Sequence, residues 1–86
     1  MKTLRILYFA TVREKTGVAE EALALDALGL PDGAATLGQL QAYLARRYPI
    51  LAHPSIRGAV NQQFATPTTP IAAGDEIAFF PPTTGG

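Results

Sequence analysis

The last eight residues of the chain, FFPPTTGG, are the segment whose composition could serve chemistry most directly. Gly85 and Gly86 leave no side chain beside the carboxylate of the final residue. With glycine at about 7% of average sequence, two such residues arise by chance in about one chain in 200. Pro81 and Pro82 stiffen the segment, because the proline ring fixes φ. The pattern predicts a stiff base that presents a slim carboxylate.

The length of this segment favours work inside another protein. Thr83 and Thr84 favour an extended backbone, and residues 81–86 can reach about 20 Å at about 3.3–3.6 Å per residue. We expect one folded domain over residues 1–80 and an extended, flexible tail over residues 81–86. The tip of that tail would fit a narrow tunnel in a partner.

The remaining residues offer no comparable set of catalytic groups. The chain has no cysteine, which excludes disulfides, thiolate metal sites and persulfides on the chain itself. The single histidine, His53, has no second ligand nearby, so we expect a loop residue and no metal site. Asp75 and Glu76 occupy a predicted turn, and Asn61 and Gln62 are expected to satisfy another turn.

Composition and charge narrow the classes of partner and compartment. Seven basic and seven acidic residues give a formal charge of zero, and no basic stretch is interleaved with aromatic residues. We therefore expect no nucleic acid partner. No apolar run approaches the roughly 20 residues that cross a bilayer, and the N-terminus lacks a small-residue cleavage site. These features predict no membrane contact and a cytoplasmic location. A chain of 86 residues also has little room for a deep pocket of its own.

The elements that must position the tail include one clear helix, predicted over residues 36–48. Thr36 and Gln39 have the spacing of a capping box, which satisfies backbone N–H groups at a helix start. Arg46 and Arg47 suit the negative end of the helix dipole, and Pro49 ends the pattern. The apolar positions fall on one face by their spacing: Leu37, Leu40, Leu44 and Tyr48.

Strands are predicted at residues 4–10 and 76–80, and on both sides of a tight turn within residues 57–65. A short helical turn over TVREKT is closed by Gly17. Residues 19–28 are rich in helix formers, yet we predict a strand at residues 20–25, since the first strand needs a partner. The order predicts an α+β fold with one main helix on one face of a mixed sheet. The β-grasp, or ubiquitin-like roll, is the leading candidate.

Strand parity predicts which aromatic side chains face solvent. A strand face that begins with a charge is expected to be the solvent face, and Arg5 and Glu76 stand at such positions. Phe9 and Phe80 share that parity and are predicted to form a partner-docking patch close to the tail, which Phe64 joins. The opposite parity would pack under the helix: Ile6, Tyr8, Ile77 and Phe79.

Nearly the whole chain resembles the small, sulfur-carrying subunits of molybdopterin synthases, within the ubiquitin-like sulfur-carrier family. The resemblance rests on LYFATVRE near the start, AVNQ at residues 59–62, GDEIAFFPP at residues 74–82 and the terminal GG. Ubiquitin-like modifiers share the GG but not the FFPP before it. The choice of a strand at residues 20–25 also leans on this resemblance.

The resemblance implies a chemical role for the tail. A partner adenylating enzyme would use ATP to convert the Gly86 carboxylate into an acyl-adenylate, with Gly85 leaving room around it. Sulfur from an external donor would then displace AMP and leave a thiocarboxylate, a soft nucleophile. This sulfur would pass to cyclic pyranopterin monophosphate during molybdopterin synthesis.

The resemblance also implies the partners. They are the large subunit of the synthase, in a heterotetramer of two small and two large subunits, the adenylating enzyme and a sulfur donor. Phe9, Phe64, Phe80 and residues 81–84 would contact partners. The chain would bind no cofactor and would not catalyse the reaction alone.

Three alternatives remain at this point. A sulfur carrier for thiamin thiazole synthesis shares the fold, the GG and the adenylation. A protein modifier would form an isopeptide bond through Gly86, although Lys2 and Lys15 are the only lysines for building polymers. A non-covalent β-grasp binding module with a disordered tail is the third.

Overall fold

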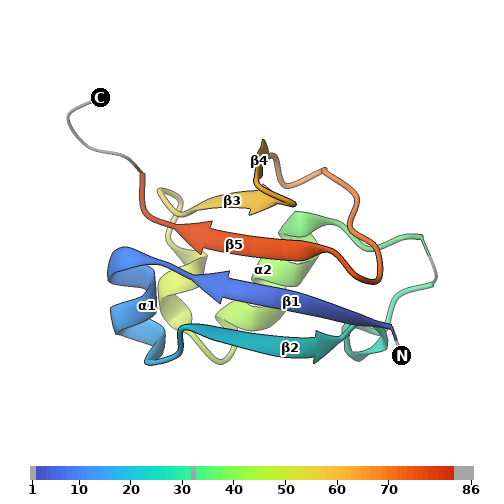
Figure 1. Ribbon diagram of the computed structural model, residues 1–86, viewed down its shortest axis with the longest axis horizontal. Coiled ribbons are helices and arrows are strands. Elements are labelled where there is room, and N and C mark those ends of the chain that lie inside the picture. Colours follow the sequence, from blue (N-terminus) through green and yellow to red (C-terminus); the bar gives the residue numbers. More distant parts are fainter. Residues whose placement is uncertain (1, 32, 83–86) are drawn as a thin grey trace.

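A mixed β-sheet forms the frame of the molecule in the computed structural model, which describes residues 2–31 and 33–82. These residues form five strands in the order β2-β1-β5-β3-β4. The strands β1 and β5 are parallel, and the other neighbours are antiparallel. The strands are β1 (Thr3–Tyr8), β2 (Glu20–Ala24), β3 (Arg57–Val60), β4 (Gln63–Ala65) and β5 (Glu76–Phe80). Helix α2 (Leu37–Ala45) lies behind one face of the sheet (Figure 1), which confirms the predicted α+β, β-grasp architecture.

Helix α2 begins where its sequence predicts and ends earlier. The backbone N–H of Gln39 donates to Oγ1 of Thr36 at 3.3 Å, and the N–H of Thr36 donates to Oε1 of Gln39 at 2.9 Å, so the capping box is formed. The predicted end at residue 48 was wrong, because the α-helix ends at Ala45. The N–H of Arg47 donates to the carbonyl of Leu44, a tighter turn than an α-helix makes.

The proline after α2 explains the early end. A residue before proline is pushed away from helical backbone angles, and Tyr48 has φ −122° and ψ 87°. Pro49 instead starts a short 3₁₀ helix, η2 (Pro49–Ala52), at a position where its missing N–H costs nothing.

The first strand also ends earlier than predicted. Strand β1 ends at Tyr8, and Phe9 is the N-cap of helix α1 (Ala10–Thr16). Ala10 has φ 53°, a left-handed conformation that nothing in its side chain announces. The predicted helical turn before Gly17 is confirmed, and Gly17 closes it with φ 75°.

Pairing with β1 overrides the helical propensity of residues 20–24. Strand β2 makes five register pairs with β1, from Leu7 opposite Glu20 to Thr3 opposite Ala24. The predicted strand is therefore confirmed to within one residue at its end. A short 3₁₀ helix, η1 (Leu25–Leu28), follows where the sequence predicted a strand end and a loop.

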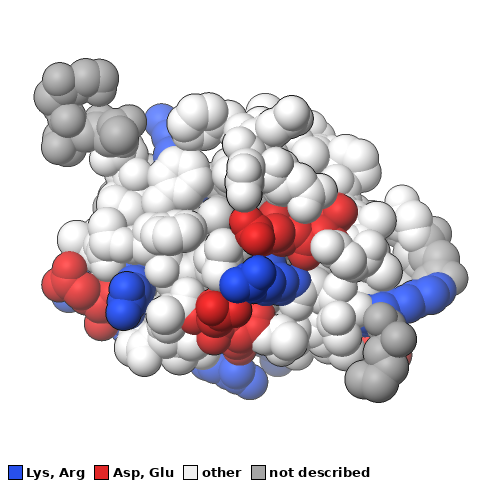
Figure 2. Space-filling model, viewed as in Figure 1, with Lys and Arg blue, Asp and Glu red and all other residues white. Residues whose placement is uncertain are grey.

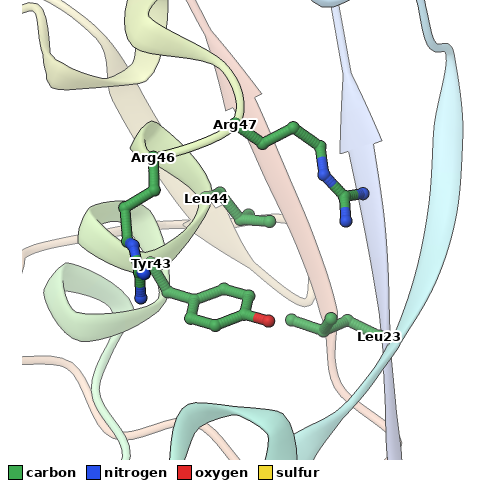
Figure 3. Close-up of a pocket in the computed structure, with 5 residues that line it drawn as sticks. All are labelled: Leu23, Tyr43, Leu44, Arg46 and Arg47. Carbon is green, nitrogen blue, oxygen red and sulfur yellow. The ribbon is translucent and has the colours of Figure 1, made fainter.

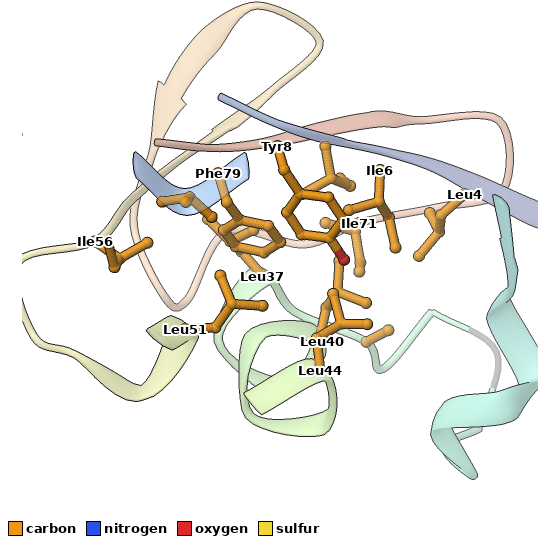
Figure 4. Close-up of a cluster of buried hydrophobic side chains, with 13 residues drawn as sticks. Leu4, Ile6, Tyr8, Leu37, Leu40, Leu44, Leu51, Ile56, Ile71 and Phe79 are labelled. Carbon is orange, nitrogen blue, oxygen red and sulfur yellow. The ribbon is translucent and has the colours of Figure 1, made fainter. Parts of the chain in front are cut away.

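The core lies between α2 and the inner face of the sheet (Figure 4). The predicted inward parity is confirmed, because Ile6, Tyr8, Ile77 and Phe79 are all buried. The rings of Tyr8 and Phe79 stack with centroids 6.3 Å apart. The other buried members of the cluster are Leu4, Val12, Ala35, Leu37, Leu40, Leu44, Leu51, Ile56 and Ile71.

Within the described residues, no helix has the length and hydropathy needed to cross a bilayer.

Candidate functional site

The predicted reactive tail continues from β5, the middle strand of the sheet (Figure 1). Pro81 and Pro82 follow Phe80 and are partly exposed. The predicted site residues after them lie outside the described residues: Thr83, Thr84, Gly85 and Gly86. The structure therefore describes the surface around the point where the chain leaves β5.

Side chains on the outer face of the sheet, opposite α2, form rows across the strands. Residues opposite each other in neighbouring strands point to the same side. In the last row before the tail, Phe80 of β5 stands opposite Arg57 of β3. The row behind it runs across four strands through its register pairs: Leu7, Ala78, Ala59 and Phe64. We call Phe80 and these four residues the apolar patch.

Two of the three predicted docking aromatics meet in this patch. The rings of Phe64 and Phe80 pack edge to face with centroids 5.8 Å apart. Phe64 is 84% exposed, and with Phe80 it belongs to a contiguous apolar surface, which is the kind of exposure that marks interaction sites. Phe9 is 48% exposed, and its N–H donates to the carbonyl of Phe79 at 3.1 Å. Among the described rings, Phe9 contacts neither Phe64 nor Phe80, so it stands apart from the pair.

The turn between β3 and β4 places Phe64 over the patch. Asn61 and Gln62 have positive φ values of 51° and 69°. Asn61 is tied to the start of β5, because its Nδ2 donates to Oδ1 of Asp75 at 3.0 Å and its Oδ1 accepts from the N–H of Glu76 at 3.0 Å. The turn role predicted for Asn61 is confirmed. The bond that fixes it to β5 required the sheet order and was not predicted.

A charged cluster borders the apolar patch at its β2 edge, where Glu20 stands opposite Leu7, and on the side away from the tail. The Nε of Arg5 lies 3.0 Å from a carboxylate oxygen of Glu20, and its NH1 lies 3.7 Å from Glu76. The hydrogen bond that Arg5 donates to Glu20, followed by the charge of that carboxylate, raises the pKa of Arg5. Figure 2 shows acidic and basic atoms gathered at the centre of this face, with uncharged surface between them and the end of β5.

A second polar network lies on the inner side of the sheet. The hydroxyl of Tyr8 donates to Glu21 at 2.8 Å, and NH1 of Arg47 lies 3.6 Å from the same carboxylate. Burial, and then the hydrogen bond to Glu21, raise the pKa of Tyr8 above its usual value. The ring of Tyr48 packs on Tyr8 with centroids 5.6 Å apart. This network ties β1 and β2 to the segment after α2.

A hollow of about 250 Å³ opens beside this network (Figure 3). Its lining comes from β2, α2 and the turn after α2: Leu23, Tyr43, Leu44, Arg46 and Arg47. In Figure 3 Arg47 extends toward the strands, and Tyr43 points its hydroxyl toward Leu23. No carboxylate or histidine lines it in the described part of the chain. Apart from the hydroxyl of Tyr43, its lining residues carry no side-chain group of the kinds that serve general acid or base catalysis.

The described side chains form no metal site. No cluster of three or more histidine, aspartate or glutamate side chains occurs among residues 2–31 and 33–82. His53 ends η2, and its Nδ1 accepts from the N–H of Ser55 at 3.1 Å, as expected of a loop residue. What this arrangement offers is an exposed apolar patch and, beside it, the base of the tail.

Comparisons with known proteins cover almost the whole chain. Residues 6–86 match the model of the ThiS family. The chain is 36% identical over 83 residues to the molybdopterin synthase sulfur carrier subunit of Escherichia coli, covering 96% of this chain and 99% of that protein. It is 38% identical over 87 residues to the protein of the same name in Haemophilus influenzae, with the same coverage of 96% and 99%.

Solved structures share the fold. SAMP1 from Haloferax volcanii is similar with a TM-score of 0.74 and 28% identity, over 98% of this chain and 99% of that one. A putative molybdopterin converting factor subunit 1 from Pyrococcus furiosus has a TM-score of 0.77 at 24% identity, over 96% of this chain and 100% of that one. The second likeness concerns the fold alone.

Proposed function

The chain belongs to the ThiS family, and from this membership we propose that it is the sulfur carrier subunit of a molybdopterin synthase. The observation that carries the proposal is the near full-length similarity to two proteins with that name. The Gly-Gly end that the chemistry needs is present in this sequence as Gly85 and Gly86. No alternative role has comparable support.

The tail would carry out the chemistry in four balanced steps. A carboxylate oxygen of Gly86 attacks the α-phosphorus of ATP, and pyrophosphate leaves. Sulfide-level sulfur from a donor attacks the acyl carbon, and AMP leaves with the electron pair of the broken C–O bond. The thiocarboxylate sulfur of Gly86 then forms a C–S bond to a carbon of cyclic pyranopterin monophosphate as a C–O bond at that carbon breaks, and the oxygen leaves with the electron pair. Water finally cleaves the acyl–sulfur bond and returns the carboxylate.

In this cycle the described domain would bind each partner and direct the tail toward the site at which it reacts. Adenylation, sulfur loading and transfer require the tail tip to enter other proteins, so the domain has to be held at a fixed distance from each site. The apolar patch lies beside the end of β5, where the tail begins. We assign the patch as the surface that the large subunit and the adenylating enzyme cover in turn.

The division of labour follows from the side chains present. The described residues supply no cluster of three or more carboxylates or histidines, and the contact of 2.7 Å between Oγ of Ser55 and Nδ1 of His53 is exposed at the end of η2, within the turn that follows it. The activating enzyme would therefore supply the ATP site, and the large subunit would supply the pterin site. The chain is a carrier and not an enzyme by itself. Since this work would require ATP and an activating enzyme, we propose that it takes place in the cytoplasm.

Intact mass spectrometry tests the proposal. The chain is incubated with its adenylating enzyme, ATP and sodium sulfide, and its mass is compared with that of a sample without ATP. We expect the mass gain of one oxygen replaced by sulfur, localised by fragmentation to Gly86. The variant without Gly86 is the control and should gain nothing. Absence of the sulfur-loaded species in the wild type would remove the proposal, and Gly-Gly remnants on lysines of other proteins would favour a modifier.

A further inference from the structure

We propose that Arg57 pairs with a carboxylate side chain of the partner that covers the apolar patch, and that this pair fixes which way round the partner sits. The inference rests on the proposed function, since it concerns the same docking event. It adds the chemistry of the contact: an aspartate or glutamate of the partner, placed at the tail end of the patch.

Arg57 occupies the border of the patch that is nearest to the tail. It is the first residue of β3 and stands opposite Phe80 in the register of β3 and β5. Because opposite residues point to the same side, its side chain shares the outer face with the ring of Phe80. Phe80 in turn packs against Phe64. A partner side chain that contacts these rings therefore lies within reach of the guanidinium.

The charge of Arg57 has no partner within residues 2–31 and 33–82. Two other arginines that face the sheet do have one, since Arg5 pairs with Glu20 and Arg47 pairs with Glu21. Arg57 is exposed and makes no side-chain hydrogen bond or ion pair in the described part of the chain. On its own face, the carboxylate of β5 belongs to Glu76, about 13 Å along the strand from Phe80 at about 3.3 Å per residue.

The fold does not require a cation at this position. The inner side of β3 is occupied by Gly58, where an added Cβ would lie 2.7 Å from Leu37, whereas Arg57 points away from the core. Arginine beside aromatic rings is the combination most enriched in the parts of interfaces that determine affinity. Its guanidinium also matches the geometry of a carboxylate better than any other cation.

The two borders of the patch carry opposite charge. Along the β2 edge of the patch and on the side away from the tail, Glu20, Arg5 and Glu76 sum to one negative charge at neutral pH, because Glu20 stands opposite Leu7 and its carboxylate contacts Arg5. On the tail side Arg57 adds one positive charge. A partner that presents an acidic group to Arg57 and a basic group to the cluster fits in one orientation and meets like charges in the reverse one. That orientation directs the tail toward one side of the partner.

Association kinetics with the cognate large subunit test this inference. The variants Arg57→Glu and Arg57→Gln are compared with the wild type at low and at high salt. Removing or reversing a charge at the border of an interface acts mainly on the association rate and its salt dependence. We expect Arg57→Glu to lower the association rate at low salt by about tenfold, with a smaller loss at high salt and an intermediate loss for Arg57→Gln.

A matched control removes the effect of net charge. Arg46→Glu changes the charge of the chain by the same amount, and Arg46 is an exposed residue of the hollow on the inner side of the sheet. Its side chain makes no ion pair with another described residue. We expect its association rate to equal that of the wild type within about twofold. Thermal unfolding of each variant reports whether the fold is retained.

The outcomes separate this inference from the docking assignment. If Arg57→Glu and Arg57→Gln associate like Arg46→Glu while Phe80→Ala binds weakly, the patch is the interface and the role of Arg57 is wrong. If Phe80→Ala also binds like the wild type, the docking surface itself is misassigned. Restoration of fast association to Arg57→Glu by an acidic-to-lysine change on the large subunit would identify the paired carboxylate.

Discussion

At the scale of single residues, Tyr8 has a buried ring and a hydroxyl group with one hydrogen-bond partner. Its ring is 1% exposed and packs between Tyr48 and Phe79. Its hydroxyl donates to Glu21, whose side chain is 19% exposed. A hydrogen bond to a charged group contributes about 1.5–3 kcal/mol where it is shielded from water. The side chain of Arg47 extends over the same carboxylate and is itself exposed.

Tyr8→Phe is expected to lower the free energy of unfolding at pH 7 by about 1–2 kcal/mol, because the ring packing stays and the hydrogen bond is lost. The folded pKa of Tyr8 is raised above its unfolded value of about 10. The stability that depends on its neutral form is thus present below pH 10 and is lost as pH rises further. Urea unfolding at pH 7 and pH 11 should show the deficit of Tyr8→Phe shrinking, by about 1.4 kcal/mol per pH unit at most.

Tyr43→Phe serves as the control for this experiment, since the Tyr43 hydroxyl is directed into the hollow of Figure 3. Its deficit relative to the wild type at pH 7 should be small. An equal pH dependence of Tyr8→Phe and the wild type would contradict the assigned role of Tyr8.

Single residues also show what the sequence could not predict. The turn at Asn61 follows from its sequence, but its bonds to Asp75 and Glu76 exist only because β3 lies beside β5. The same holds for Arg5, whose two carboxylate partners come from the strands on either side of β1. Such pairs join residues about 15 or more positions apart and require the sheet order to be known.

At the scale of elements, starts were easier to predict than ends. Helix α2 begins where the Thr36 and Gln39 pair specifies it, because that signal is local and chemical. Its end depends on Tyr48, because the proline that follows disfavours helical backbone angles at that residue. The apolar spacing alone had instead predicted that Tyr48 belongs to the helix. Strand β1 ends because Ala10 adopts a left-handed backbone conformation, which an alanine in the sequence does not predict.

The outer face of the sheet is expected to act through Phe80. Phe80→Ala should weaken binding to the large subunit and to the adenylating enzyme by about 2 kcal/mol or more, as is typical of an interface hot spot. Little fold stability should be lost, because Phe80 is only partly buried. Isothermal titration calorimetry measures the binding, and thermal unfolding measures the stability.

Phe79→Ala is the matched comparison, one residue away and on the opposite face. Phe79 is fully buried, so this change should lower the free energy of unfolding by about 3–5 kcal/mol. If Phe80→Ala instead unfolds as Phe79→Ala does, and its binding loss follows that unfolding, the docking role of Phe80 is wrong.

At the scale of the whole molecule, folding and chemistry are expected to be separable. Deletion of Gly86 should leave thermal unfolding unchanged and abolish sulfur transfer, because the carboxyl carbon that reacts would then lie one residue closer to the domain. Gly85→Val should nearly do the same, since a branched side chain would fill the tunnel. Molybdopterin formation in the reconstituted synthase measures the transfer. Activity retained in either variant would show that the terminus is not the acyl group that carries sulfur.

The division between tail and domain also explains how much of the site the sequence could predict. The role of Gly85 and Gly86 stays a prediction, drawn from a compositional signal that needs no fold. The pairing of Phe64 with Phe80 was expected only loosely, because the phase of β4 after its turn decides it. The placement of Arg57 beside Phe80 depends on the register of two antiparallel strands and was not predicted.

The middle position of β5 has a consequence for the order in which the chain can fold. The pairs β1–β2 and β3–β4 are local in sequence, whereas Arg5 and Glu76 are joined across nearly the full chain. Such long-range pairing forms late, because the entropy of closing a large loop opposes it. Phe64 and Phe80 come from strands on opposite sides of the β3–β5 seam, so they meet only when β5 has closed the sheet. A partner whose binding requires contact with both rings therefore binds the fully folded chain. It does not bind a partly folded chain in which β5 has not yet paired with β3.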